Sequence, residues 1–85
     1  METRHYTAIF EKAEEGGYVV TCPALPGLST EGDTLEEASL MVQDAARGYI
    51  ESLKDDGISI PQDIETITIP DGVKAIIKTI TVTIN

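Results

Sequence analysis

The sequence predicts one α+β domain in which a single long helix packs on a small mixed β-sheet as two layers. Three observations carry this prediction. Strand-forming residues fill both ends of the chain, one central stretch has the apolar spacing of a helix, and glycine or proline separates the segments. The expected element order is β-β-β-α-β, with room for a second strand in the tail. The chain's 85 residues suit one domain spanning 1–85.

The first third of the chain reads as a β-hairpin followed by a short third strand. Residues 4–12 alternate, with Tyr6, Ala8 and Phe10 on one side. A loop with two adjacent glycines covers 13–17, and residues 18–22 supply the antiparallel partner strand. A third strand is expected at 28–30, and we expect Glu31 and Gly32 to end it.

A proline-rich corner connects the second and third strands. Pro26 holds its φ near −65° and Gly27 accepts a positive φ, which together suit a type II turn. Two readings of the corner stay open: a turn that positions the third strand, or a surface that contacts a partner through Leu25 or Leu28. The residues of this candidate site are Pro23, Leu25, Pro26, Gly27 and Leu28.

The strongest pattern in the chain predicts a helix over roughly residues 34–56. Thr34 and Glu37 form a capping box at its start, and Gly57 suits the position after its end. One apolar stripe recurs at spacings of three, four and seven. This stripe either forms the core against the sheet or contacts another chain. Its members are Leu35, Ala38, Val42, Ala45, Ala46, Tyr49 and Leu53.

The C-terminal tail, residues 62–85, is rich in isoleucine and threonine and has no helical stripe. We expect one strand from Ile64 to Ile69, a turn at 70–72, and a last strand from Ile76 to Ile84. The last strand pairs either inside its own sheet or with a second copy of the chain. Because the core is small, we predict a homodimer or larger assembly. Its interface is expected at or near Ile80, Val82 and Ile84.

Charge and composition exclude several classes of partner. Fifteen acidic residues against six basic ones give a net charge of −9, which repels nucleic-acid phosphates and anionic membranes and attracts a basic protein. Aromatic residues make up only 5%, and tryptophan is absent, so no base-stacking platform is expected. The absence of a long apolar run or a signal-peptide pattern predicts a soluble, cytoplasmic protein.

Few residues could carry catalysis or hold a metal. Cys22 is the only cysteine and His5 the only histidine, which excludes an intrachain disulfide and leaves too few soft ligands for an ordinary zinc site. Pairing of the first two strands is expected to bring His5 near Cys22, but a packed cysteine and a surface histidine remain the simpler reading. The acidic clusters read as solvated surface. No catalytic, cofactor-binding or metal residue is therefore predicted.

An ordered set of motifs resembles the HicB antitoxin family. The set covers roughly residues 4–61 and consists of Tyr6–Phe10, Gly17–Val20, the corner Cys22–Gly27, and the helix start Glu31–Ala38. The resemblance implies a partly degraded RNase H-like fold without the nuclease carboxylates. It also implies a non-catalytic antitoxin that binds and blocks a small basic HicA-type toxin, a ribonuclease that cuts mRNA. Members of the family form dimers or larger assemblies.

The tail departs from the fuller family pattern. Many HicB antitoxins carry a C-terminal DNA-binding domain, whereas the stretch after Ile58 here is rich in isoleucine and threonine. Direct DNA binding is therefore not expected. The alternative to a toxin-binding antitoxin is a stand-alone, self-assembling module without a toxin, and a residual RNase H-like nuclease is a third, more distant reading.

Overall fold

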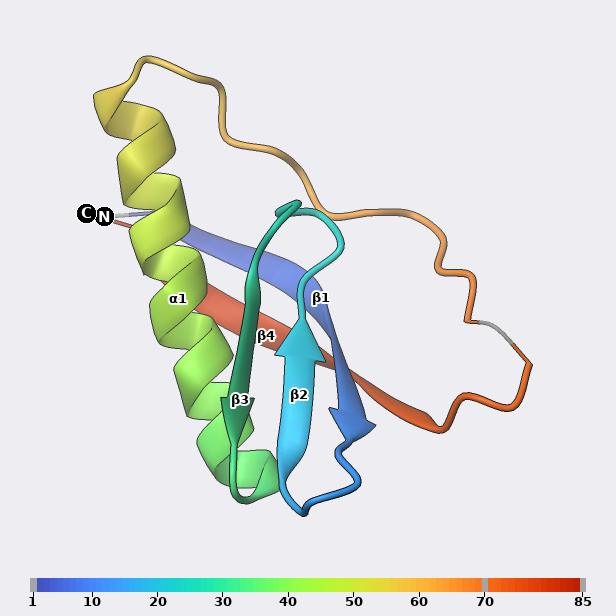
Figure 1. Cartoon of the computed structure of the whole chain (residues 1–85). Coiled ribbons are helices and arrows are strands. Elements are labelled where there is room, and N and C mark those ends of the chain that lie inside the picture. The colour runs from blue at the N-terminus through green and yellow to red at the C-terminus, as the bar shows by residue number, and fades with distance from the viewer. Residues whose placement is uncertain (1, 70, 85) are drawn as a thin grey trace.

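A four-stranded antiparallel sheet with one helix across one face makes up the molecule (Figure 1). The computed structural model describes residues 2–69 and 71–84. The strands lie side by side in the order β3-β2-β1-β4. The two-layer α+β prediction is confirmed, but every strand pair is antiparallel, so the expectation of a mixed sheet was wrong. The elements are β1 Glu2–Lys12, β2 Tyr18–Thr21, β3 Ser29–Gly32, α1 Leu35–Asp55 and β4 Ala75–Ile84.

The long strand β1 organises the sheet because it pairs on both sides. Its C-terminal half pairs with β2, where Ile9 lies opposite Thr21, and nearly its whole length pairs with β4, where Tyr6 lies opposite Ile80. As the alternation predicts, the side chains of Tyr6, Ala8 and Phe10 are fully buried on one face. That face is the one covered by α1 (Figure 1).

Close backbone packing explains why β3 extends further than expected. Glu31 and Gly32 were predicted to end the third strand, and this was wrong, because both are paired in β3 with residues of β2. A Cβ atom added to Gly32 would lie 2.4 Å from the backbone nitrogen of Ala38 in α1. Gly32 therefore continues the strand and lets the start of the helix lie directly against it.

The helix α1 has the ends and the buried face that its sequence predicts. The hydroxyl oxygen of Thr34 accepts a hydrogen bond of 3.0 Å from the backbone N–H of Glu37. After the helix, Gly57 has a φ of +72° and donates its backbone N–H to the carbonyl of Lys54. Much of the predicted stripe faces the sheet, and Ile50 must be added to it. The fully buried helix residues are Ala38, Val42, Ala46 and Ile50.

The connection between α1 and β4 contains no strand in its described residues, so the strand predicted at Ile64–Ile69 was wrong. Its half-buried isoleucines are Ile64, Ile67 and Ile69, and the spacing of three between the first two breaks the period of two that a strand needs. The turn predicted at 70–72 is present at Gly72, whose φ is +84°, while Pro70 lies outside the described residues.

A single core joins the helix to the sheet. Its largest fully buried side chains include Tyr6, Phe10, Leu25, Ile50 and Ile84. Within the described residues, no buried side-chain nitrogen or oxygen lacks a hydrogen-bond partner. No helix in the described part of the chain is long and apolar enough to cross a bilayer.

Candidate functional site

The proline-rich corner consists of two consecutive tight turns. The backbone N–H of Leu25 donates to the carbonyl of Cys22 at 2.9 Å, and that of Leu28 donates to the carbonyl of Leu25 at 3.1 Å. Gly27 has a φ of +87°, the positive value that the third position of a type II turn requires. The predicted turn is therefore present, with Pro26 and Gly27 in the expected places.

The two leucines of the corner point inward. Leu25 is fully buried and Leu28 nearly so, while Pro26 and Gly27 are exposed. The hydroxyl of Tyr49 in α1 donates a 2.9 Å hydrogen bond to the carbonyl of Pro26, which ties the corner to the helix. Pro23 is half-buried, so the exposed residues of the corner are Pro26 and Gly27.

A second polar anchor holds the connection after α1 against β1. The carboxylate of Asp63 accepts two hydrogen bonds from Thr7, one from the backbone N–H at 2.9 Å and one from the hydroxyl at 2.7 Å. This part of β1 extends beyond the end of β2, so Asp63 takes the place that a neighbouring strand would occupy. Sequence reasoning missed Asp63, because no local pattern relates it to a residue 56 positions earlier.

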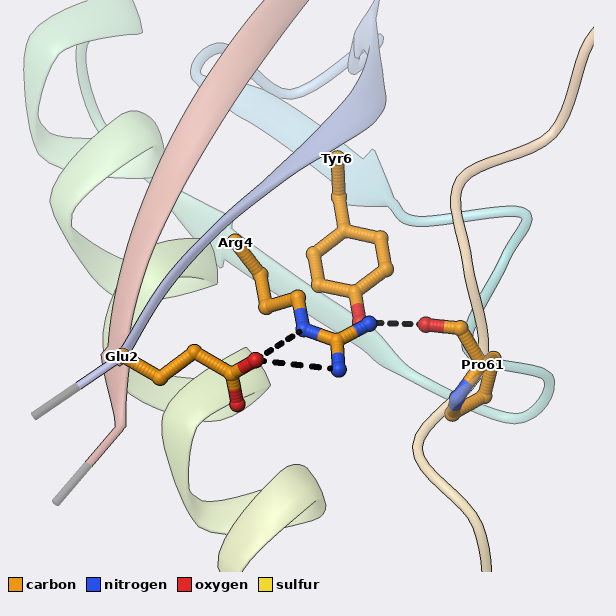
Figure 2. Close-up of polar contacts among 4 residues, drawn as sticks. All are labelled: Glu2, Arg4, Tyr6 and Pro61. Atoms are coloured by element: carbon orange, nitrogen blue, oxygen red, sulfur yellow. Dashed lines mark hydrogen bonds and ion pairs between the residues drawn. The ribbon is translucent and has the colours of Figure 1, made fainter.

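Tyr6, whose side chain lies in the core, also binds the connection after α1. Its hydroxyl donates a 2.6 Å hydrogen bond to the carbonyl of Pro61 (Figure 2). Burial raises the pKa of Tyr6, and the nearby Arg4 partly opposes that rise. Arg4 also forms an ion pair of 3.2 Å with Glu2, which Figure 2 shows beside the tyrosine. The phenol therefore stays protonated and serves as a donor.

The predicted proximity of His5 and Cys22 was wrong. The β1–β2 register places Thr21 opposite Ile9, so Cys22 lies well away from His5 along the strand. His5 is exposed, with its Nδ1 3.3 Å from the hydroxyl oxygen of Thr81 in β4. Cys22 is buried, and burial raises the pKa of its thiol to about 11, which keeps it protonated and unreactive near neutral pH. The two residues form no catalytic pair.

Several acidic residues line a surface hollow of about 470 Å³ between the β1–β2 hairpin, the end of β3 and the start of α1. Its lining also includes Tyr18 and Met41. Among the residues that the structure describes, none of its carboxylates takes part in an ion pair. The carboxylates that line it are Glu15, Glu31, Asp33 and Glu37.

These carboxylates do not make a metal centre. Across residues 2–69 and 71–84, no group of three or more histidine, cysteine, aspartate or glutamate side chains is close enough to hold an ion. What the hollow offers is a concentration of exposed negative charge beside an exposed methionine. Such a surface suits a cationic partner with some apolar character.

The predicted interface residues Ile80, Val82 and Ile84 have their side chains in the core of their own chain, each no more than 2% exposed. They lie under α1 on the inner face of β4. An interface at these positions would therefore have to use the backbone of β4 and its outer neighbours. Within β4, the exposed large apolar residues are Ile76 and Ile77, at the start of the strand.

Comparison with solved structures shows the same fold. The chain aligns with a toxin–antitoxin complex from Streptococcus pneumoniae at a TM-score of 0.83 and 16% identity, over 96% of this chain and 70% of that one. It aligns with the N-terminal domain of the Burkholderia pseudomallei antitoxin HicB at a TM-score of 0.77 and 23% identity, over 93% of this chain and 98% of that one.

Relatives found by sequence share a higher identity with this chain than these two solved structures do. A UPF0150 protein of Thermoplasma acidophilum is 51% identical over 65 residues, which covers 75% of this chain and 94% of that protein. The antitoxin HicB 1 of Photorhabdus laumondii is 39% identical over 61 residues, which covers 72% of this chain but only 39% of the antitoxin. Residues 6–84 match the family described as the HicB-like antitoxin of bacterial toxin–antitoxin systems. The family match and the corner, capped helix and sheet order together show that this chain belongs to the HicB-like antitoxin family.

Proposed function

We propose that this chain is a non-catalytic cytoplasmic antitoxin that binds a small basic HicA-type toxin and covers its working surface. The observation that carries the proposal is the acidic hollow, whose four carboxylates lack ion-pair partners within the described residues. A net charge of −9 adds long-range attraction for a basic protein. The fold also occurs in a structure described as a HicA3 and HicB3 toxin–antitoxin complex, at a TM-score of 0.63.

The positions of the nucleophile and base candidates support the absence of catalysis. Cys22 is buried and protonated, and His5 lies exposed at a distant point of β1. Because residues 2–69 and 71–84 also hold no cluster of carboxylates close enough to bind a metal ion, the purified protein, incubated with RNA and Mg²⁺, is expected to leave the RNA intact. Metal-dependent cleavage that copurifies with the protein would instead revive the residual nuclease reading.

The test of the proposal is coexpression with the basic protein encoded by a neighbouring reading frame. We expect the chain to restore growth, to copurify with that protein and to stop its cleavage of RNA. Glu15→Lys with Glu31→Lys, in the hollow, should weaken binding by about tenfold or more, because both changes reverse charge at the contact. Glu51→Lys with Asp55→Lys, near the other end of α1, changes the net charge equally and is the matched control.

Two results would count against the proposal. Equal weakening by both pairs of substitutions would mean that only net charge matters, and no weakening by either pair would move the contact away from the hollow. If no neighbouring basic protein exists, the stand-alone module is favoured. One observation supports this alternative: the alignment covers 94% of the Thermoplasma protein but only 39% of the Photorhabdus antitoxin.

A further inference from the structure

A second, largely apolar hollow lies beside the acidic hollow. It measures about 210 Å³ and is formed by the end of β1, the start of β2 and the beginning of β4. Tyr18 lines both hollows, so the two are neighbours on the surface. We call the second one the lysine hollow. Its lining residues are Phe10, Lys12, Tyr18, Lys74, Ala75 and Ile76.

The lysine hollow exists because α1 does not reach this end of the sheet. Ile76 lies opposite Phe10 in the β1–β4 pairing, so both side chains are on the face that α1 covers. Phe10 is fully buried there, but Ile76 is 39% exposed. Figure 1 shows the start of β4 well to the side of α1. Ile76 is therefore an apolar side chain that its own chain leaves partly uncovered.

Two exposed lysines flank these apolar side chains. Among the residues that the structure describes, neither Lys12 nor Lys74 takes part in an ion pair. They are two of only six basic residues in a chain with a net charge of −9. The lysine hollow therefore places positive charge and apolar surface directly beside the negative charge of the acidic hollow.

The size of the lysine hollow suits one side chain of a protein partner. Small-molecule sites usually measure about 300–1,000 Å³, whereas this hollow measures about 210 Å³. At protein interfaces, a single apolar side chain that fills a pocket often supplies much of the binding energy. An acidic residue next to such a side chain would meet Lys12 and Lys74, and the charges would be complementary.

We propose that the lysine hollow takes an apolar side chain of the toxin with an acidic residue beside it, while the acidic hollow takes basic residues of the same toxin. This inference rests on the proposed function and adds to it the basis of partner choice. The acidic hollow attracts any basic protein, because long-range charge attraction is not selective. A basic protein that brings a cation to the lysine hollow meets like charge there and binds less tightly.

Charge reversal in the lysine hollow tests the proposal, because the expected effect is opposite in sign to that of net charge. Lys12→Glu with Lys74→Glu makes the chain more acidic, which by net charge alone would tighten its binding to a basic toxin. We expect the affinity for purified toxin, measured by isothermal titration calorimetry, to fall by about tenfold or more instead. Lys54→Glu with Lys78→Glu changes the net charge equally outside both hollows, and should leave the affinity unchanged or raise it. Circular dichroism checks that both proteins are folded.

A second pair of variants tests the apolar part of the contact without changing any charge. Ile76→Ala should weaken toxin binding by about fivefold, because it removes apolar surface that the toxin side chain covers. Ile77→Ala is the matched control, since Ile77 is 48% exposed but lies on the opposite face of β4. The control should bind toxin as wild type does. Equal affinities of the two variants would overturn the proposal.

Failure of this proposal is distinguishable from failure of the proposed function. If the acidic-hollow variant weakens toxin binding but the Lys12 and Lys74 variant behaves as its control does, the proposed function stands and this proposal fails. If the wild-type chain binds no toxin, both fail. If Ile76→Ala keeps its toxin affinity but loses binding of free octanoate, or self-association of the chain, the lysine hollow has a different occupant and the proposal is overturned.

Discussion

Two irregular connections in this molecule differ in how much they rely on local contacts, although the corner also has one distant anchor, from Tyr49 to the carbonyl of Pro26. The corner at 22–28 is built from hydrogen bonds between residues three apart, and its leucines are buried in the core. The connection at 58–74 relies on Pro61 and Asp63. They accept hydrogen bonds from residues of β1 that lie 55 and 56 positions earlier, respectively. Irregular backbone can therefore be specified either by local turn chemistry or by a few distant polar anchors.

The difference affects both predictability and stability. Local turns have compositional signatures, such as Pro26 followed by Gly27, that can be recognised in the amino-acid sequence itself. Distant anchors have no such signature, because their partners are brought together only by the completed sheet. The second connection should also open more readily, since it buries less apolar surface.

The largest expected difference between the two connections lies in their apolar anchors. Leu25→Ala should lower the free energy of unfolding by about 3 kcal/mol, because the fully buried side chain leaves a cavity. Ile64→Ala should cost only about 1 kcal/mol, because Ile64 is half-buried. Urea unfolding followed by circular dichroism measures both.

Exposed Leu40 supplies the control for these two changes. Leu40→Ala should alter stability by no more than about 0.5 kcal/mol. Equal losses for Leu25→Ala and Ile64→Ala would show that the two connections are anchored alike.

The glycine of the corner should give the next largest effect. Gly27→Val should destabilise the protein by about 1–2 kcal/mol, because a β-branched residue is strained at a φ of +87°. Space is not the cause, since a Cβ at this position meets no atom within 4 Å. An unchanged thermal midpoint would contradict the turn assignment.

Gly48, inside α1 and equally free of neighbours around a Cβ, is the matched control. Gly48→Ala should stabilise the protein by about 0.5–1 kcal/mol, because alanine is the better helix former. The opposite signs of the two changes separate backbone strain from a general effect of added atoms.

The polar anchor of the second connection should contribute about 1–2 kcal/mol. Asp63→Ala removes both hydrogen bonds to Thr7 and should cost that amount, whereas Thr7→Val removes only the hydroxyl bond and should cost less. The double variant should cost little more than Asp63→Ala alone, because that change already removes the bond that Thr7→Val removes. Hydrogen exchange should show faster opening in the second connection and unchanged protection of the corner. Additive losses would mean that Asp63 and Thr7 act independently.

The smallest effect concerns pH and the corner's Cys22. Its pKa is raised from 9.0 to about 11 by burial, so the folded state favours the protonated thiol. The resulting stability is fully present below the unfolded pKa near 9.0 and is lost as pH rises towards about 11. Cys22→Ala should therefore lose less stability than wild type across that range. Unfolding free energies measured by urea titration at several pH values check this. Parallel plots of unfolding free energy against pH for the two proteins would contradict a raised pKa for Cys22.

How much of the molecule could be predicted from the sequence depends on the same difference between local and distant contacts. Thr34, Gly57 and the alternation of Tyr6, Ala8 and Phe10 report on neighbours within a few residues, and the elements they predict are confirmed. The false strand at 64–69 came from composition, since isoleucine and threonine are frequent there without a regular period of two. Composition alone does not distinguish a strand from an extended connection.

The candidate site was harder to predict than the fold. The turn at Pro26–Gly27 was foreseeable, but the burial of Leu25 and Leu28 depends on where α1 crosses the sheet. The acidic hollow joins Glu15, Glu31 and Glu37 from three separate elements, which only their packing brings together. The mistaken pairing of His5 with Cys22 came from a register that the loop length alone does not determine.

The pairing of β1 with β4 also governs when the protein can fold. Ribosomes deliver β1 first and β4 last of the five elements, yet Glu2 lies opposite Ile84. During synthesis, the N-terminal half of β1 therefore waits without its neighbour while nearly the whole chain is made. Contacts between residues so distant in sequence slow folding and leave intermediates exposed to proteases and aggregation. A freshly made chain thus passes through a vulnerable interval that ends only when its last strand docks.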